Sequence, residues 1–138
     1  MTFDQNISSA GADTLPWVLV VDDEESIRQI MVGFLRETGV EVVDAVDAAS
    51  ALVILGKRLT EPLIVFVDVV MPGMDGLTLS RKLRATLKTA RIVLMSGQTS
   101  RKSWWPADLR EIPFLDKPFR HSELVEMVRL ARAENDGA

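Results

Sequence analysis

The sequence predicts an α/β fold built on a doubly wound, five-stranded parallel sheet. Several short segments, such as residues 63–67, are apolar runs without polar alternation, which is the pattern of strands covered on both faces. Segments with helical periodicity separate these runs, as in parallel α/β proteins. Three runs are strongly apolar and suit the middle of the sheet, whereas two are weaker and suit its edges. With right-handed crossovers, this gives the strand order 2-1-3-4-5.

The first strand is predicted over residues 17–21, and it ends in Asp22 and Asp23. The next segment carries apolar residues at the spacing of one helical face, and Gly39 is suited to end that helix. The residues of this face are Ile27, Ile30, Met31, Phe34 and Leu35. The second strand, residues 40–43, is short and more polar, which indicates a sheet edge.

Asp47 can cap a second helix, whose apolar residues are Ala48, Ala51, Leu52 and Leu55. The third strand, residues 63–67, ends abruptly in Asp68. Pro and Gly in residues 69–76 break the strand, and Asp75 can cap a third helix. The apolar residues of this third helix are Leu77, Leu79, Leu83 and Leu87.

A fourth buried strand is predicted over residues 91–95, before Ser96 and Gly97. Residues 99–111 are predicted to be irregular in place of a regular fourth helix, with a short helix whose first position is Pro106. Residues 113–115 form a short edge strand. The last helix is marked by Leu124, Met127, Val128 and Ala131. We expect flexible tails at residues 1–15 and 134–138.

Polar side chains follow four of the five predicted strands. They are Asp22 and Asp23 after the first strand, Asp68 after the third, Ser96 after the fourth and Lys117 after the fifth. Parallel strands end at the same edge of a sheet, so these side chains should converge. Three carboxylates and one ammonium sum to −2, which favours entry of a hard divalent cation, and Mg²⁺ fits oxygen ligands best.

This arrangement leaves one carboxylate free to act as a nucleophile. Attack by an Asp on a phosphoryl group gives an acyl phosphate, which is an established kind of covalent intermediate. The metal, Lys117 and the Ser96 hydroxyl would then neutralise or bond the phosphoryl oxygens. The sequence therefore predicts phosphoryl chemistry at this edge of the sheet.

The chain resembles the receiver domain of two-component response regulators over residues 17–133. The matching segments are residues 20–24, with Asp22-Asp23-Glu24, residues 67–68 with the loop 71–76, residues 95–96, and residues 117–119, with Lys117-Pro118-Phe119. Each segment is a weak signal, but all four in order at receiver-like intervals are a strong one. The resemblance implies a flavodoxin-like fold in a single-domain receiver similar to chemotaxis regulators, with tails at 1–15 and 134–138 around a domain at 16–133.

The resemblance implies that Asp68 accepts a phosphoryl group from a sensor histidine kinase or a histidine phosphotransfer protein. It implies that Asp22, Asp23, Asp68 and the backbone carbonyl of Val70 bind Mg²⁺, directly or through water, with Mn²⁺ as a substitute. Lys117 is expected to pair with the phosphoryl group. In the family, the hydroxyl at the Ser96 position turns toward the phosphate.

An aromatic ring at the Phe114 position also swings inward in the family. This movement repacks the face made by the fourth helix, the fifth strand and the fifth helix, which is expected to meet an unknown downstream protein. A homodimer remains open.

The sequence departs from the family at several positions. Ser96 replaces the commoner threonine and keeps the hydroxyl, and Gly97 stands where alanine is usual. Leu109-Arg110 occupies the place of a usual Gly-Ala turn. Trp104 and Trp105 lie where a regular fourth helix is expected, and an exposed tryptophan there would be a typical partner anchor. The output face is therefore the least regular part of the match.

Composition limits the other classes of function. The net charge of −4 disfavours nucleic acid and anionic membranes as partners, and Arg81, Arg84 and Lys88 are interpreted as a solvated helix face. The absence of cysteine and of any membrane-spanning run or signal peptide indicates a soluble cytoplasmic protein. His121, the single histidine, lacks the context of a phosphodonor.

Two alternatives to the phosphoacceptor stay open. One is a phosphohydrolase with an Asp nucleophile, but such enzymes commonly carry an acid two residues after the nucleophile, where this chain has Val70. The other is a phosphorylation-independent adaptor with a vestigial site. We expect no enzyme activity beyond self-directed phosphotransfer and autodephosphorylation. With fewer than ten residues after the last helix, the effect would pass through a partner, a relay or a larger protein.

Overall fold

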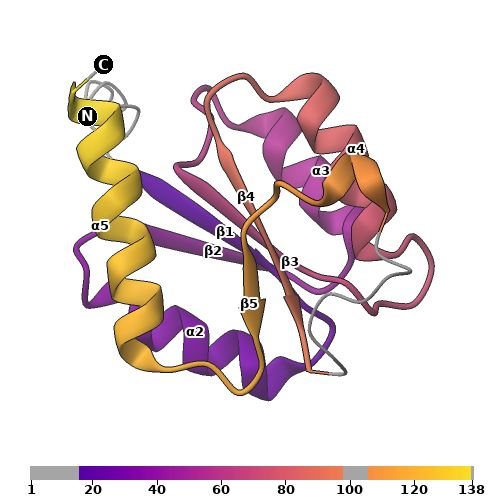
Figure 1. The fold of residues 1–138 in the computed structure, drawn as a ribbon, viewed down its shortest axis with the longest axis horizontal. Coiled ribbons are helices and arrows are strands. Elements are labelled where there is room, and N and C mark those ends of the chain that lie inside the picture. Colours follow the sequence, from indigo (N-terminus) through magenta and orange to yellow (C-terminus); the bar gives the residue numbers. More distant parts are fainter. Residues whose placement is uncertain (1–15, 98–105, 138) are drawn as a thin grey trace, which may run out of the picture.

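The structure is a computed structural model that describes residues 16–97 and 106–137. Its five strands form one parallel sheet in the order β2-β1-β3-β4-β5, which confirms the predicted order (Figure 1). The strands are β1 (Trp17–Val21), β2 (Glu41–Ala45), β3 (Ile64–Asp68), β4 (Arg91–Ser96) and β5 (Phe114–Asp116).

The strands fall into the predicted central and edge classes. Every residue of β1 and β3 is buried, as expected where helices cover both faces of a parallel sheet. Strand β2 alternates between exposed and buried residues at one edge. It begins and ends later than the predicted 40–43, because it stays in register with β1 until Ala45 pairs with Val21.

Two helices cover each face of the sheet (Figure 1). Helices α2 (Glu25–Arg36) and α5 (His121–Gly137) lie on one face, and α3 (Ala48–Lys57) and α4 (Gly76–Thr86) lie on the other. The sheet separates the two hydrophobic cores that these helix pairs form against its faces. This is the doubly wound arrangement that the alternating pattern predicts.

The predicted helix caps are present. The side chains of Asp47 and Asp75 each accept a hydrogen bond of 2.8 Å, from the N–H of Ser50 and Thr78 respectively. Gly39 was expected to end α2, but the helix ends at Arg36, and Gly39 has a φ of +87° in the left-handed turn that follows. The predicted apolar face of α2 is wrong at Ile30, which is 46% exposed because the fully buried Met31 and Leu35 form the centre of that face.

The structure describes only part of the segment that was predicted to replace a regular fourth helix. Trp104 and Trp105 lie outside the described residues. The described part is a three-residue 3-10 helix, η1 (Ala107–Leu109), which begins after Pro106. Pro106 therefore caps this helix and does not occupy its first position. Leu109 is fully buried in the core between the sheet and the α3–α4 layer.

Helix α5 continues beyond the end predicted for the domain. It runs to Gly137, whereas a tail was expected from residue 134. Glu134 forms an ion pair with Arg91 at the start of β4, and no proline interrupts the helix before Gly137. The expected N-terminal tail, residues 1–15, lies outside the described residues. None of the described helices has the length and apolar content needed to span a membrane.

The carboxylate of Glu61 joins two loops at the amino edge of the sheet. Its oxygens accept hydrogen bonds of 2.8 to 3.0 Å from the backbone N–H groups of Lys88, Thr89 and Ala90 and from the Thr89 hydroxyl. Burial alone would raise the pKa of Glu61, but these hydrogen bonds outweigh it and hold the pKa below its ordinary value. The ionised carboxylate therefore stabilises the fold.

We expect Glu61→Gln to lower the free energy of unfolding at pH 7 by about 1–2 kcal/mol, since hydrogen bonds to a charged group are lost. Because the pKa is lowered on folding, this contribution is present above the ordinary pKa and is lost as pH falls through the folded value. Urea unfolding at pH 7 and at pH 3 should show the difference shrinking at pH 3. Glu126→Gln, at an exposed α5 carboxylate paired with Arg129, serves as the control. An equal loss at both pH values would contradict the role of the charge.

Candidate functional site

The structure brings together the predicted acidic residues at the carboxyl edge of the sheet. Asp22 and Asp23 follow β1, and Asp68 is the last residue of β3. One carboxylate oxygen of each lies within 4.8 Å of the others. Lys117 follows β5 and reaches the same place, and Ser96 ends β4 beside them in the sheet.

Asp22 is the most enclosed of these carboxylates. It is fully buried, and its backbone N–H donates to the carbonyl of Ala45 at 3.1 Å. Its Oδ1 accepts from the N–H of Glu24 at 2.9 Å, and its Oδ2 accepts from Lys117 Nζ at 2.7 Å. Both carboxylate oxygens are therefore oriented by short contacts.

Asp68 is only 5% exposed, yet its carboxylate has weaker partners. Its Oδ1 lies 3.3 Å from the N–H of Val70, and its Oδ2 lies 3.5 Å from Lys117 Nζ. Burial and the negative charge of Asp22 raise the pKa of Asp68 to about 6, against the opposing effect of Lys117. Asp68 thus carries a charge that the protein alone compensates incompletely.

Lys117 is the ammonium that the carboxylates share. Burial lowers its pKa, but the hydrogen bond to Asp22 and the charges of Asp68, Asp22 and Glu24 outweigh burial and raise the pKa above its ordinary value. Its backbone N–H donates to the carbonyl of Ser96 at 3.0 Å, which ties β5 to the end of β4. Lys117 is therefore protonated, and its backbone is fixed at the point where β4 and β5 end.

The remaining predicted residues surround this centre. Ser96 is 5% exposed, and Val70 is 59% exposed in the loop after β3. Phe114 is partly buried in β5 and packs against the core on the α3–α4 side. A Cβ placed on Gly97 would lie 3.4 Å from Lys117 Cβ, in ordinary contact, so an alanine would fit there.

Two residues that support the site were not singled out from the sequence. Arg28 of α2 donates from Nη1 to the backbone carbonyl of Asp22 and from Nε to Asp44, both at 2.9 Å, and its side chain is 15% exposed. Gly76 donates its N–H to the carbonyl of Val69 at 2.9 Å. The signal for Arg28 was an arginine in the helix that follows the paired acids, but solvated arginines on helices are common.

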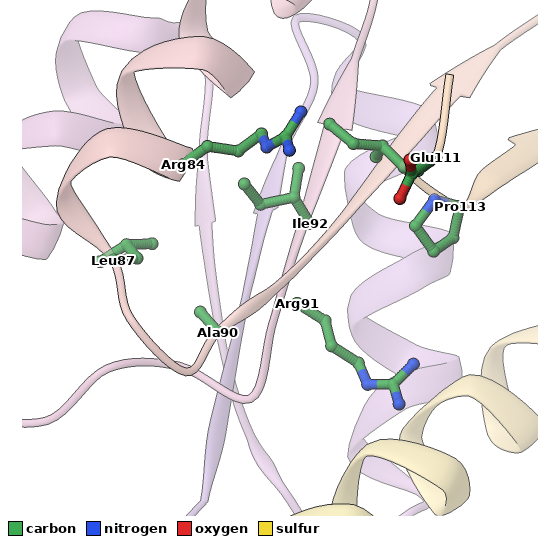
Figure 2. A pocket seen from close by; sticks show the side chains of 8 residues that line it. Arg84, Leu87, Ala90, Arg91, Ile92, Glu111 and Pro113 are labelled. Atoms are coloured by element: carbon green, nitrogen blue, oxygen red, sulfur yellow. The ribbon is translucent and has the colours of Figure 1, made fainter. Parts of the chain in front are cut away.

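Three grooves of the described surface are lined by residues other than the site carboxylates. One of them lies where β4 begins and is drawn in Figure 2. Its lining residues are Arg84, Leu87, Ala90, Arg91, Ile92, Glu111, Ile112 and Pro113. Because β4 begins at Arg91 and ends at Ser96, this groove is at the opposite edge of the sheet from Asp68 and takes no part in its chemistry.

Comparison with known proteins identifies relatives over most of the chain. The family model described as response regulator receiver domain matches residues 18–129. Protein PetR of Rhodobacter capsulatus is 36% identical over 113 residues, which cover 80% of this chain and 46% of PetR. The sensor kinase CckA of Brucella abortus is 38% identical over 114 residues, which cover 81% of this chain and 12% of CckA. The chain spans about half or less of the length of these curated relatives.

A solved structure adds a bound state of a similar protein. The response regulator protein TrrA of Thermotoga maritima, in complex with Mg²⁺ and BeF, superposes with a TM-score of 0.73 at 29% identity. The superposition covers 85% of this chain and 99% of the TrrA chain.

Proposed function

The chain belongs to the response regulator receiver domain family, and from that premise we propose that Asp68 accepts a phosphoryl group from a phosphohistidine. The donor would be a sensor histidine kinase or a histidine phosphotransfer protein. The observation that carries the proposal is that Asp22, Asp23 and Asp68 bring carboxylate oxygens within 4.8 Å of one another. The protonated Lys117 contacts two of them, Asp22 and Asp68. The acceptor role, its partners and a cytoplasmic location are parts of this proposal.

The donor set fits Mg²⁺. Asp22, Asp23 and Asp68 offer hard carboxylate oxygens, and the raised pKa of Asp68 indicates a buried charge that a cation would stabilise. We propose that these three residues and the backbone carbonyl of Val70 hold the ion, with Mn²⁺ as a substitute. When bound, Mg²⁺ would supply charge compensation for phosphoryl oxygens. The Mg²⁺–BeF complex of TrrA supports this proposal.

In the proposed reaction, the ionised Asp68 oxygen attacks phosphorus while the bond from phosphorus to the donor imidazole nitrogen breaks. The electron pair stays on that nitrogen, and an acyl phosphate forms on Asp68. Lys117 is already within 3.5 Å of Asp68 Oδ2, so its ammonium is placed to pair with the new phosphoryl group. The Ser96 hydroxyl is proposed to bond the same group.

We propose that the hydrogen bond from the Ser96 hydroxyl to the phosphoryl group changes the output face, the surface expected to contact a downstream protein. Ser96 ends β4, and Phe114 lies on β5, which is hydrogen-bonded to β4 along residues 94–96. A movement of Ser96 toward the phosphoryl group would leave room for the Phe114 ring to turn inward. The face would be the one that the family resemblance implies, made by the fourth-helix segment, β5 and α5, and its partner would be a downstream protein or a second copy of the chain.

Phosphohydrolase activity is the less supported alternative. Val70 occupies the position where such enzymes commonly carry a general acid, and its side chain is apolar and 59% exposed. We therefore propose that the chemistry is limited to self-directed phosphotransfer and autodephosphorylation. A vestigial site in a phosphorylation-independent adaptor is disfavoured because all of Asp22, Asp23, Asp68, Ser96 and Lys117 are in place.

Incubation with acetyl phosphate and Mg²⁺ should add one phosphoryl group to the protein, measured by intact mass, because Asp68 is the nucleophile. Asp68→Asn should remain unmodified. Asp108→Asn, which changes an exposed carboxylate paired with Arg81, should be modified like the original protein. Modification of Asp68→Asn would place the acceptor elsewhere. Rapid turnover of small phosphate esters would favour the phosphohydrolase.

A further inference from the structure

Exposed apolar side chains gather on helix α3. In the described part of the chain, seven large apolar side chains are exposed, and four of them lie on α3 or directly beside it. These four are Val46 at 45% exposed, Leu52 at 37%, Val53 at 55% and Leu59 at 81%. The other three, Ile30, Val70 and Leu130, lie on three different elements. Exposed apolar side chains are therefore concentrated at α3, whereas exposed apolar residues scattered singly over a surface are ordinary.

The exposed residues of α3 form a continuous face. Ala49, Leu52, Val53 and Gly56 are all exposed and recur at i, i+3, i+4 and i+7, which is the spacing of one side of a helix. None of them is charged. Val46 and Leu59 are also exposed, in the segments just before and just after α3. We call Ala49, Leu52, Val53 and Gly56 the α3 face.

The opposite side of α3 already packs on the sheet. Ala48 and Ala51 are buried in the core, and Ile54 and Leu55 pack against it. Helix α3 is therefore apolar on both sides, whereas a helix at the surface of a globular protein ordinarily carries polar residues on its outer side. An apolar outer side indicates that a second surface covers it.

The two ends of α3 carry opposite charges. Asp47 caps the amino end, and Lys57 is exposed in the last turn. If two copies of α3 pack antiparallel about a two-fold axis between residues 52 and 53, the Asp47 end of one copy lies beside the Lys57 end of the other. A parallel arrangement would place like charges together. The charge pattern is thus complementary to itself in the antiparallel arrangement only.

The residues that this two-fold axis would pair are also suited to each other in size. The axis pairs the small residues Ala49 and Gly56, which allows the two backbones to approach, and it pairs Leu52 with Val53 at the centre. Every position on the α3 face therefore has an apolar counterpart of suitable size in a second copy.

We propose that the α3 face is a self-association surface on which the α3 of a second copy packs antiparallel. A ten-residue helix is only about 15 Å long, so the contact is smaller than the roughly 800 Å² per partner of stable complexes. The dimer is accordingly weak and forms with increasing protein concentration. It weakens with added salt, because its end contacts pair opposite charges at the surface. None of the site residues lies on this face, so the association does not depend on phosphorylation.

Sedimentation equilibrium over a range of protein concentrations tests the proposal. The original protein should show a monomer–dimer equilibrium, and Val53→Glu and Val53→Lys should each weaken it at least tenfold by repelling their own copies at the axis. A mixture of these two variants should associate again, because the introduced charges are opposite. Val53 is exposed, so both variants should keep the circular dichroism spectrum of the original protein.

Leu130→Glu is the matched control, since it adds the same charge at an exposed leucine on α5 and should leave association unchanged. A protein that stays monomeric at every concentration would overturn the proposal, as would loss of the dimer in Leu130→Glu but not in Val53→Glu. Acetyl phosphate should modify Val53→Glu as it modifies the original protein. That readout separates failure of the α3 face from failure of the phosphoacceptor assignment.

Discussion

Gly76→Ala is expected to lower the free energy of unfolding by on the order of 3 kcal/mol or more, because no space exists for a methyl group at this position. A Cβ on Gly76 would lie 2.1 Å from the carbonyl oxygen of Asp68 and 2.8 Å from Val69 Cα. Both neighbours are backbone atoms, so a side-chain rotation cannot relieve the overlap.

The same substitution is expected to impair the candidate site. Relief of the overlap requires α4 to move away from the end of β3, and the N–H of Gly76 would then lose its 2.9 Å bond to Val69. Any accompanying shift at the end of β3 would move Asp68 itself, because the overlapped carbonyl belongs to that residue. Phosphorylation from acetyl phosphate should therefore fall even under conditions in which the variant remains folded.

Gly33→Ala is the matched control, since Gly33 lies within α2 and no heavy atom is within 4 Å of a Cβ built on it. Alanine in a helix interior is favoured over glycine by roughly 0.5–1 kcal/mol, so this variant should be slightly more stable than the original protein. Urea unfolding of both variants measures the contrast. A Gly76→Ala protein with unchanged stability would contradict the close contact.

Most of the fold could be predicted from the sequence because the three central strands and the helix caps have strong local signals. Residues 63–67 are apolar throughout and end in a carboxylate, and Asp47 and Asp75 occupy cap positions before helical patterns. The bounds of β2 were harder to predict. Asp44 is polar, yet it belongs to the strand because its carboxylate pairs with Arg28 at the exposed edge.

The site was predicted from the rule that parallel strands end at one edge, which needs only strand order. That rule places Asp22, Asp68 and Lys117 together, as the structure does. It carries no information on close packing, so the contact between Gly76 and the Asp68 backbone could not be foreseen. The extent of α5 was missed for a similar reason, since its last turn is held by a pair between Glu134 and Arg91, which are distant in sequence.

The second prediction concerns how Asp68 makes the free energy of unfolding of the metal-free protein depend on pH. Burial and Asp22 raise the pKa of Asp68 to about 6, above its ordinary value of 3.8. The folded state therefore binds the Asp68 proton more tightly than the unfolded state does. The corresponding stability is fully present below pH 3.8 and is lost as pH rises through about 6. At neutral pH without Mg²⁺, the ionised Asp68 opposes folding.

Asp68→Asn is accordingly expected to stabilise the metal-free protein at pH 8 by on the order of 2 kcal/mol, since a pKa unit corresponds to about 1.4 kcal/mol and part of the shift is screened by solvent. Thermal unfolding in EDTA measures this gain, which should shrink toward zero as pH falls well below 3.8, because the carboxyl is then protonated in both states.

Saturating Mg²⁺ should reverse the order at pH 8. The ion stabilises the folded original protein through its three carboxylates and stabilises the variant less, because one ligand has lost its charge. A variant that is less stable than the original protein in EDTA at pH 8 would show that Lys117 already compensates Asp68 fully. In that case the electrostatic reason for a cation at this site would no longer hold.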